Sequence, residues 1–405
     1  MPSVTYQKDL LSGDPLWAGS SSPVRTRSLN ESIRADVVIV GGGISGALMA
    51  HALTSRYDNV VLVDRRPPAH GSTLASTAML QFEIDTPLRE LRDKIGPKAA
   101  RAWQRSYTAT QDLIALIQGE NIRCGLATRN SLYLAGNTLG ARGLKAEAAA
   151  RRRIGLPGDY LSAATLRDEY GIQRTGAIAS PGSASANPVQ LATGLLRKAV
   201  AQGLKIYAPV QVNDVMATKH GVMLDAGDHF IEARHCVFCT GYEMLKTVPT
   251  RGTKITSSWA IASRPHAQYP AWLDRTLVWE AADPYLYIRT TPDGRLIVGG
   301  EDEDIDLASY RFRSLARKSA RLVAKANALL PETKIIASQR WTGAFGESDD
   351  GLPIIDAVPG LPHCYTVMGF GGNGTIYSLI AAQIIPTLLQ GRPDKDVDLY
   401  RFRGA

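Results

Sequence analysis

Three glycines near the start of the chain have the spacing of a nucleotide-binding turn. Gly41, Gly43 and Gly46 follow the apolar run of residues 36–40 and open an apolar stretch that continues to about residue 55. In such a turn the first glycine permits the tight bend, the second lets the backbone approach a pyrophosphate, and the third lets a helix pack closely on the strand. The start of the helix then offers free amides and partial positive charge to phosphates. We therefore predict a dinucleotide site with contacts at Gly41, Gly43, Ile44, Ser45 and Gly46.

An acidic residue ends the next apolar run, residues 59–64, and strengthens this prediction. Asp64 follows the glycine turn at roughly the spacing, about 20 residues, at which a carboxylate accepts the hydroxyls of an adenosine ribose. Arg65 beside it could instead indicate a cofactor with a 2′-phosphate, but Asp64 would repel that group. We expect both residues at the adenosine end of a cofactor that lacks the phosphate.

Two further segments indicate which dinucleotide is bound. One is the hydroxyl-rich loop of residues 71–78, which could lie against a pyrophosphate or a flavin ring. The other is the glycine loop of residues 369–374 before the last predicted helix, although a simple glycine turn would look the same. A nicotinamide-binding domain has no need of a second, distant glycine loop, whereas FAD is long and must be held at both ends. We predict FAD, with further contacts at Ser72, Thr73, Ser76, Thr77, Gly371, Gly372, Asn373, Gly374 and Thr375.

A strand-like segment further along carries side chains suited to a small substrate. Tyr285, Tyr287 and Arg289 alternate, so all three point to one face of a strand. Facing a flavin, the tyrosines could surround an amine while Arg289 pairs with a carboxylate through two hydrogen bonds. An inter-domain salt bridge or a solvated sheet face remains the alternative. Trp341, before the expected flavin-facing loop, could wall the same pocket or simply pack.

The elements that must position these residues indicate two domains. A chain of 405 residues exceeds the usual size of one hydrophobic core. Residues 36–64 are typical of a β-α-β unit in a parallel sheet. The expected fold class is α/β, a Rossmann-like FAD-binding domain with an inserted α+β substrate domain on a mostly antiparallel sheet. The strands of that sheet are predicted at residues 256–263, 276–280, 284–291 and 295–300, before a helix at 311–330.

The bulk composition excludes several classes of protein. Hydrophobic residues make up 44% and charged residues 21%, which is an ordinary globular balance. The net charge of +8 is scattered along the chain, so we expect no nucleic-acid partner. We find no apolar run of membrane-spanning length and no secretory signal, and we expect a cytoplasmic protein. Neither the histidines nor Cys236 and Cys239, which read as part of a buried strand, suggest a metal site.

The motifs together resemble the family of FAD-dependent D-amino acid oxidase-like (DAO) enzymes, which includes glycine and sarcosine oxidases and γ-glutamylputrescine oxidase-type amine oxidases. The resemblance runs in family order over about residues 35–390, specifically at both ends and loosely in the middle. It adds Thr240 and Gly241 to the cofactor site. The matching segments are residues 38–46, 64, 238–241, 285–291, 293–295, 299–300, 341–343 and 369–374.

The resemblance also implies how the chain divides. The FAD-binding domain would comprise residues 1–95, 170–245 and 335–405, and the substrate domain residues 96–169 and 246–334. The flavin ring would lie between the domains, with the backbone of Val210 near the adenine. The last helix would point its N-terminus at the pyrimidine edge of the flavin, where it stabilises the negative charge of the reduced ring.

Departures from the family pattern bear on the chemistry. Sarcosine-oxidase-like relatives hold the substrate carboxylate with basic residues where this chain has residues 78–81, which include none. Lysines of those relatives are replaced by Thr375 and by the stretch 295–298. A sarcosine-like substrate is therefore not expected, and the electron acceptor remains either oxygen or a quinone or partner protein. The cysteine and histidine that carry covalent flavin in some relatives have no counterparts, so we predict non-covalent FAD.

The leading hypothesis is an enzyme that transfers hydride from a C–N bond of an amine or amino acid to flavin N5 and gives an imine that water hydrolyses. Positioning by Tyr285, Tyr287, Arg289 and Trp341 would supply much of the catalysis. One alternative is a dehydrogenase that passes electrons to an acceptor other than oxygen. Another is a flavin-binding subunit or sensor without turnover, because a fold does not fix a function.

Overall fold

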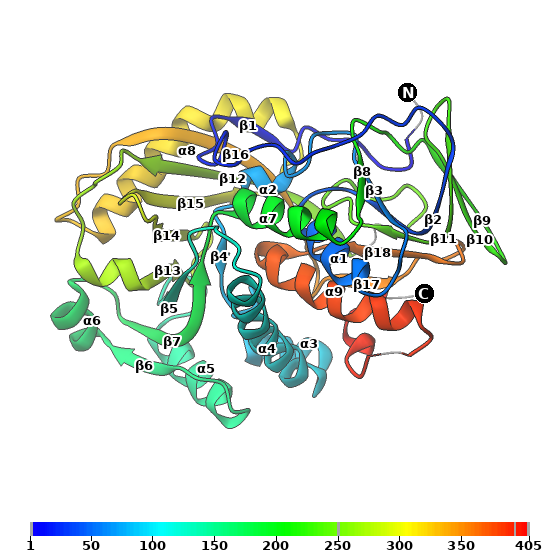
Figure 1. The fold of residues 1–405 in the computed structure, drawn as a ribbon. Helices are drawn as coiled ribbons and strands as arrows, with labels where there is room; N and C mark the ends of the chain where they lie inside the picture. Colours follow the sequence, from blue (N-terminus) through cyan, green and yellow to red (C-terminus); the bar gives the residue numbers. More distant parts are fainter. Residues whose placement is uncertain (1–2, 249–251, 393, 403–405) are drawn as a thin grey trace.

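Two β-sheets and the helices packed on them make up the computed structural model, which describes residues 3–248, 252–392 and 394–402 (Figure 1). The eight-stranded sheet has the order β17-β18-β11-β2-β3-β8, and the hairpin β9–β10 joins it at β11. Strands β18, β11, β2, β3 and β8 run parallel. The bounds are β2 (Ile33–Val40), β3 (Val60–Val63), β8 (Lys205–Tyr207), β9 (Asp214–Thr218), β10 (Gly221–Asp225), β11 (Phe230–Phe238), β17 (Ile354–Ala357) and β18 (Cys364–Met368).

Both faces of the parallel strands are buried, which explains their continuous apolar runs. Val37 and Ile39 of β2 pack in the same core cluster as the helices α1, α7 and α9. Val38 and Val40 point the other way, into a cluster shared with the hairpin β9–β10. The helices are α1 (Ile44–Thr54), α2 (Ser72–Ala75), α3 (Leu88–Ile95), α4 (Lys98–Gly119), α5 (Ala141–Arg153), α6 (Ala163–Tyr170), α7 (Pro188–Ala201), α8 (Ala308–Leu329) and α9 (Gly374–Leu389).

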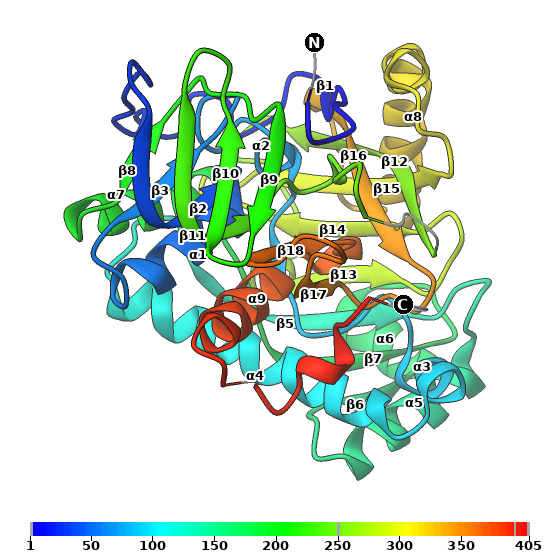
Figure 2. The same ribbon diagram turned by 90° about the vertical axis from the view of Figure 1, so that its right-hand side faces the viewer.

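The ten-stranded sheet has the order β1-β16-β12-β15-β14-β13-β5-β7-β4, with β6 paired to β7. Its pairs are antiparallel except β13 with β5, and α8 lies along β12, β15 and β16 (Figure 2). The predicted mostly antiparallel sheet is thus confirmed. Its strands are β1 (Leu11–Gly13), β4 (Met79–Leu80), β5 (Ala127–Leu134), β6 (Asp159–Ser162), β7 (Gly176–Ser185), β12 (Thr253–Ser263), β13 (Thr276–Glu280), β14 (Leu286–Thr290), β15 (Leu296–Glu303) and β16 (Ala337–Ser348).

Sheet membership bears on the domain boundaries. β7 and β16 belong to the ten-stranded sheet, although the sequence placed residues 176–185 and 337–348 with the FAD-binding parts. A division by sheet would move both strands to the substrate side. The domain boundaries remain a proposal. Within the predicted domain ranges, residues 1–2, 249–251, 393 and 403–405 lie outside the described residues.

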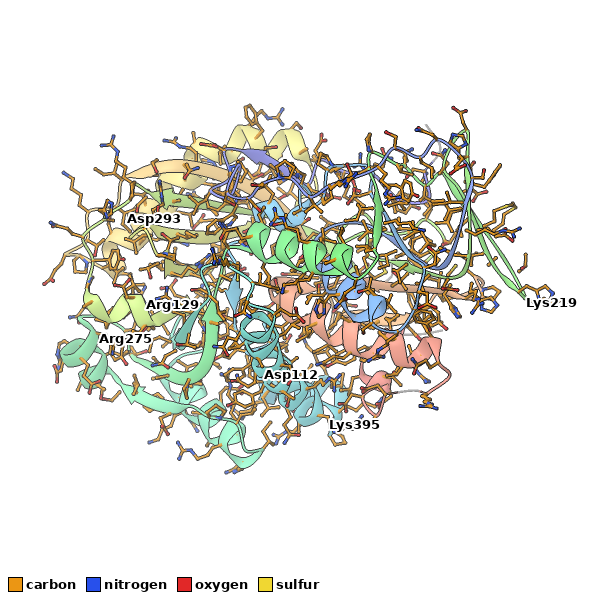
Figure 3. All side chains as sticks on the ribbon, in the orientation of Figure 1. Asp112, Arg129, Lys219, Arg275, Asp293 and Lys395 are labelled. Atoms are coloured by element: carbon orange, nitrogen blue, oxygen red, sulfur yellow. The ribbon has the colours of Figure 1, made fainter. Side chains whose placement is uncertain are left out.

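Charged side chains are spread over the molecule (Figure 3). Lys219 lies at the tip of the β9–β10 hairpin, whereas Arg275 lies at the opposite end beside the ten-stranded sheet (Figure 3). Within the described part of the chain, no helix is both long and apolar enough to cross a membrane.

A buried ion pair joins the helices around the lower end of the ten-stranded sheet. Arg151 Nε donates to Glu147 Oε1 at 2.8 Å, and both side chains are at most 1% exposed. The two Glu147 oxygens also accept the amides of Leu88 and Arg89 at the start of α3. The Arg151 guanidinium lies over the Trp103 ring of α4, 4.3 Å from its centroid. The ion pair of Glu147 and Arg151 therefore connects α5, which carries both residues, to α3 and α4.

Replacing Glu147 with alanine should destabilise the fold strongly, because it leaves a buried guanidinium without a partner. We expect a loss of about 3–5 kcal/mol, measured as a lower midpoint of urea unfolding. The matched control is Asp159→Ala, whose partner Arg152 is 65% exposed and whose own side chain is 81% exposed. The exposed pair of Asp159 and Arg152 should contribute little to the free energy of unfolding. A Glu147→Ala protein with an unchanged midpoint would contradict this account.

Candidate FAD and substrate site

A large cavity lies between the two sheets and is lined from both. Val40 and Cys239, at the carboxyl ends of β2 and β11, form its wall on the parallel side, where ligands of such sheets bind. Two of the predicted site residues, Gly46 and Arg289, are not part of the wall. Those that line it are Gly41, Gly43, Ile44, Ser45, Asp64, Arg65, Ser72, Thr73, Ser76, Thr77, Val210, Thr240, Gly241, Tyr285, Tyr287, Trp341, Gly371, Gly372, Asn373, Gly374 and Thr375.

The glycine turn has the close contacts that its sequence requires. Gly41 has a φ of +111°, and a Cβ there would lie 2.3 Å from the carbonyl oxygen of Cys239. A Cβ on Gly46 would lie 1.8 Å from the carbonyl oxygen of Gly41. Gly46 therefore serves the packing of α1 on β2, which explains why it lies behind the cavity wall. The first turn of α1 has neither an acidic residue nor a side-chain cap, so its positive end is left for an anion.

Asp64 is held rigidly at the far end of the same wall. Its Oδ2 accepts the amide of Gly42 at 2.6 Å, and its Oδ1 accepts the amide of Arg66 at 2.8 Å. Burial raises the pKa of its carboxyl, while these amides act in the opposite direction. Each oxygen keeps a second lone pair, so the fixed carboxylate can still accept two ribose hydroxyls.

The two arginines after Asp64 are paired with one carboxylate, on a residue that the sequence did not indicate. Arg65 and Arg66 both bind the carboxylate of Glu243, in the loop after β11. Burial alone would raise the pKa of Glu243, but hydrogen bonds from Arg66 and Arg65 lower it overall. Arg65 lines the cavity as predicted, yet its charge is committed to Glu243 rather than available to a phosphate.

Three buried donors fix consecutive carbonyls of the hydroxyl-rich loop. Trp341 Nε1 donates to the Ala75 oxygen at 2.8 Å, Trp17 Nε1 to that of Ser76 at 2.7 Å, and Arg289 Nε to that of Thr77 at 2.5 Å. We call these three donors the loop clamp. The loop is also tied to α1, because the Ile44 amide donates to Thr73 Oγ1 at 2.9 Å. Its position is therefore set by the N-terminal segment, α1 and the ten-stranded sheet together.

Arg289 does not face the cavity as the strand alternation suggested. Its guanidinium also donates to the carbonyls of Ala186 and Thr290 and lies 5.3 Å from the centroid of the Trp17 ring. Burial, together with the neighbouring Arg129, lowers its pKa to about 9. Alternation does place it beyond Tyr285 and Tyr287 on β14, but the loop covers that part of the strand. Arg289 positions the loop and has no approach to a substrate carboxylate.

The second glycine loop is held by the segment after β4. Asp85 Oδ2 accepts the amide of Gly372 at 2.7 Å, and the Asn373 side chain donates to the carbonyl of Glu83. Asp85 is exposed and lines the cavity, and desolvation by the surrounding atoms raises the pKa of its carboxyl to about 6. The Gly372 amide acts in the opposite direction. The start of α9 is thereby fixed against the cavity.

Polar residues that the sequence did not single out line the end of the cavity near β14. Gln81 and Asp85 come directly after the hydroxyl-rich loop, and Ser258 comes from β12. The Tyr285 and Tyr287 rings stand 5.8 Å apart between centroids, tilted by 33°. The alternation of Gln81, Glu83 and Asp85 with Phe82 and Ile84 was the signal that could have identified this wall.

Known proteins similar to this chain share its fold. A glycine oxidase of Geobacillus kaustophilus is 24% identical, over 91% of this chain and 96% of its own. The γ-glutamylputrescine oxidoreductase of Escherichia coli is 23% identical, over 91% of this chain and 86% of its own. The crystal structure of the Geobacillus kaustophilus glycine oxidase superimposes with a TM-score of 0.72 at 22% identity, covering 92% of this chain and 99% of the other. An L-amino acid deaminase from Proteus myxofaciens gives 0.74 at 14% identity, covering 98% and 99%.

A further relative is longer than this chain. It is a Bacillus subtilis protein named as a Rieske 2Fe-2S iron–sulfur protein, 25% identical over 63% of this chain and 50% of its own length. The match therefore spans only half of that relative. The sequence profile of the family described as FAD dependent oxidoreductase (DAO) matches residues 36–386. Since that match covers most of its 405 residues, the chain belongs to the FAD dependent oxidoreductase family.

Proposed function

We propose that this protein oxidises a C–N bond of an amine or amino acid with FAD as the electron acceptor. One observation carries the proposal. A single cavity joins the glycine turn and Asp64 to a pocket walled by Tyr285, Tyr287 and Gln81. A cofactor lying along this cavity would have its adenosine at the edge of the eight-stranded sheet. Its reactive ring would lie beside the polar and aromatic pocket.

The residues present fit FAD at each part of the cavity. Asp64 suits the adenosine ribose, and the start of α1, which has no acidic residue in its first turn, suits the pyrophosphate. The amide of Val210 is bound to the carbonyl oxygen of Asp64 at 2.7 Å, so backbone contact with the adenine would use the Val210 carbonyl. The start of α9, which also has no acidic residue in its first turn, suits the pyrimidine edge of the ring. When bound, FAD accepts a hydride at its N5 atom.

The protein's own contribution to this reaction is orientation. Tyr287 lies on β14 and Tyr285 directly precedes that strand, and both line the cavity, so they form a wall against which a substrate C–H bond can be aligned. Burial, with Asp302 nearby, raises the pKa of both hydroxyls, that of Tyr287 to about 12. Both tyrosines therefore stay neutral and act as hydrogen-bonding groups. Trp341 supports the loop that walls the same space.

The residues that line the cavity also support non-covalent binding of FAD and an electron acceptor other than oxygen. Cys239 is the one cysteine among the described residues that line the cavity, and burial raises its pKa to about 12. A neutral thiol at the nucleotide end does not bond covalently to a flavin. The described lining residues include no lysine, and their arginines, Arg65 and Arg66, are paired with Glu243. A cation that would attract electrons toward oxygen is thus lacking, which favours a quinone or partner protein as acceptor.

The purified protein should be yellow and should release intact FAD when it is denatured with acid. Anaerobic addition of amines and amino acids should bleach the flavin absorption with at least one compound. Reoxidation should be slow in air and fast with an artificial electron acceptor. A colourless protein that takes up no FAD would disprove the cofactor assignment. Fast reoxidation of the reduced flavin by air would disprove the proposal that the electron acceptor is not oxygen.

Replacing Asp64 with alanine should weaken FAD binding by about 10- to 100-fold, since hydrogen bonds to a charged group contribute about 1.5–3 kcal/mol. Equilibrium dialysis or quenching of FAD fluorescence measures this directly. The control is Asp58→Ala, an exposed acid in the turn before β3, which should bind FAD as the parent does. Equal affinities for the two variants would remove Asp64 from the site.

Arg289→Ala should act through the cofactor rather than through the substrate. It removes a member of the loop clamp, so we expect faster loss of FAD during dialysis and a loop more open to proteolysis. The rates of bleaching by carboxylated and uncarboxylated substrates should fall by the same factor. A selective loss for carboxylated substrates would instead support the direct pairing that the sequence suggested.

A further inference from the structure

One end of the cavity offers hydrogen-bond acceptors and negative charge without a matching cation. We define the substrate chamber as the lining residues Met79, Gln81, Asp85, Ser258, Tyr285 and Tyr287. They come from β4 and the segment after it, from β12, and from β14 with the residue before it. All these elements meet where the ten-stranded sheet faces the start of α9.

Gln81 presents an acceptor that no protein group satisfies. The residue is only 6% exposed and lines the cavity, yet its Oε1 has no hydrogen-bond partner. A buried carbonyl oxygen without a partner costs free energy. This oxygen is itself closed off from solvent, and the Gln81 side chain carries no charge that could pair with a substrate carboxylate.

Asp302 adds negative charge directly behind the chamber. Both of its carboxylate oxygens are buried, and the hydroxyls of Ser258 and Tyr285 lie beside them. Burial raises the pKa of this carboxyl to about 7, although the nearby hydroxyls of Ser258 and Tyr285 act in the opposite direction. Asp85 lies close enough to raise that pKa further. Asp85 therefore lies on the wall of the chamber, and Asp302 adds to its negative potential from behind that wall.

The cations that could compensate these acids are all engaged elsewhere. Among the described residues that line the cavity, the basic ones are Arg65 and Arg66, which are bound to Glu243 at the nucleotide end. Arg289 is turned into the loop clamp. A substrate carboxylate in the chamber would therefore meet Asp85, with Asp302 behind it, and the described lining residues offer no unpaired arginine or lysine to offset the repulsion.

We propose that the substrate is an amine with no carboxylate on its reacting carbon, recognised as a cation by Asp85 on the chamber wall, with Asp302 behind the wall adding to the negative potential. The inference rests on the proposed function and narrows its substrate class. Tyr285 and Tyr287 complete the site, because the faces of aromatic rings attract ammonium groups. The chamber thus selects by charge, accepting amines and rejecting the corresponding α-amino acids.

Paired ligands that differ only by the carboxylate test this selection. The pairs are ethylamine with alanine, propylamine with 2-aminobutyrate, and benzylamine with phenylglycine. Binding to the FAD-loaded protein is followed anaerobically by perturbation of the flavin spectrum before any bleaching, and by the shift in melting temperature. The amine of at least one pair should bind about tenfold more tightly than its amino acid, the effect of one charge-assisted hydrogen bond.

The variants Asp85→Asn and Asp302→Asn keep the side-chain shape and remove the charge. Each should lower the ratio of amine to amino acid affinity several-fold, whereas a general folding defect would weaken both ligands equally. Asp159→Asn, on an exposed strand, is the control and should keep the parent ratio.

The outcomes distinguish the proposed selection of amines from the broader proposal that the protein oxidises C–N bonds. Equal binding within every pair, tighter binding of the amino acids, no binding of any amine, or an unchanged ratio in both chamber variants would overturn it. If amino acids alone bleach the flavin, the charge selection is wrong while the proposed C–N oxidation stands. If the protein takes up FAD and no compound bleaches it, the proposed function itself fails.

Discussion

The shape of the cavity depends on where three consecutive backbone carbonyls of the hydroxyl-rich loop are held. Trp341, Trp17 and Arg289 bind the oxygens of Ala75, Ser76 and Thr77, and each donor comes from a different part of the chain. Since buried carbonyls are costly when unpaired, the loop cannot move without breaking several contacts at once. Its side chains face the cavity, so the geometry of the nucleotide and substrate ends is set by one short segment.

Charge is distributed unevenly along the cavity, and the distribution follows from which groups are already paired. At the nucleotide end, Arg65 and Arg66 share one carboxylate, that of Glu243, and the proposed cofactor contacts are helix amides and the Asp64 carboxylate. At the other end, the described lining residues include no basic partner for Asp85 or Asp302, and desolvation shifts the pKa values of these two carboxyls upward. The fold therefore provides positive potential for phosphates and negative potential for a cation within one continuous space.

The sequence predicted those parts that depend on local pattern. The glycine turn, Asp64 and the parallel strands follow from short-range spacing, and the structure has them where expected. It did not predict β7, because residues 176–185 are mostly small and lack alternating polarity. Arg289 was misjudged for a different reason. Alternation fixes the face of a strand but not which segment covers it, and the covering loop lies more than two hundred residues earlier. Glu243 and Asp302 matter through distant neighbours, which no local pattern reveals.

The loop clamp also sets an order of assembly. During synthesis the glycine turn, β3 and the hydroxyl-rich loop leave the ribosome early, but two of the donors that fix the loop follow at positions 289 and 341. The nucleotide-binding strands can form while the loop between them and β4 is still unrestrained. The wall of the cavity is therefore complete only when nearly the whole chain has emerged, and a chain interrupted before position 341 lacks part of the loop clamp.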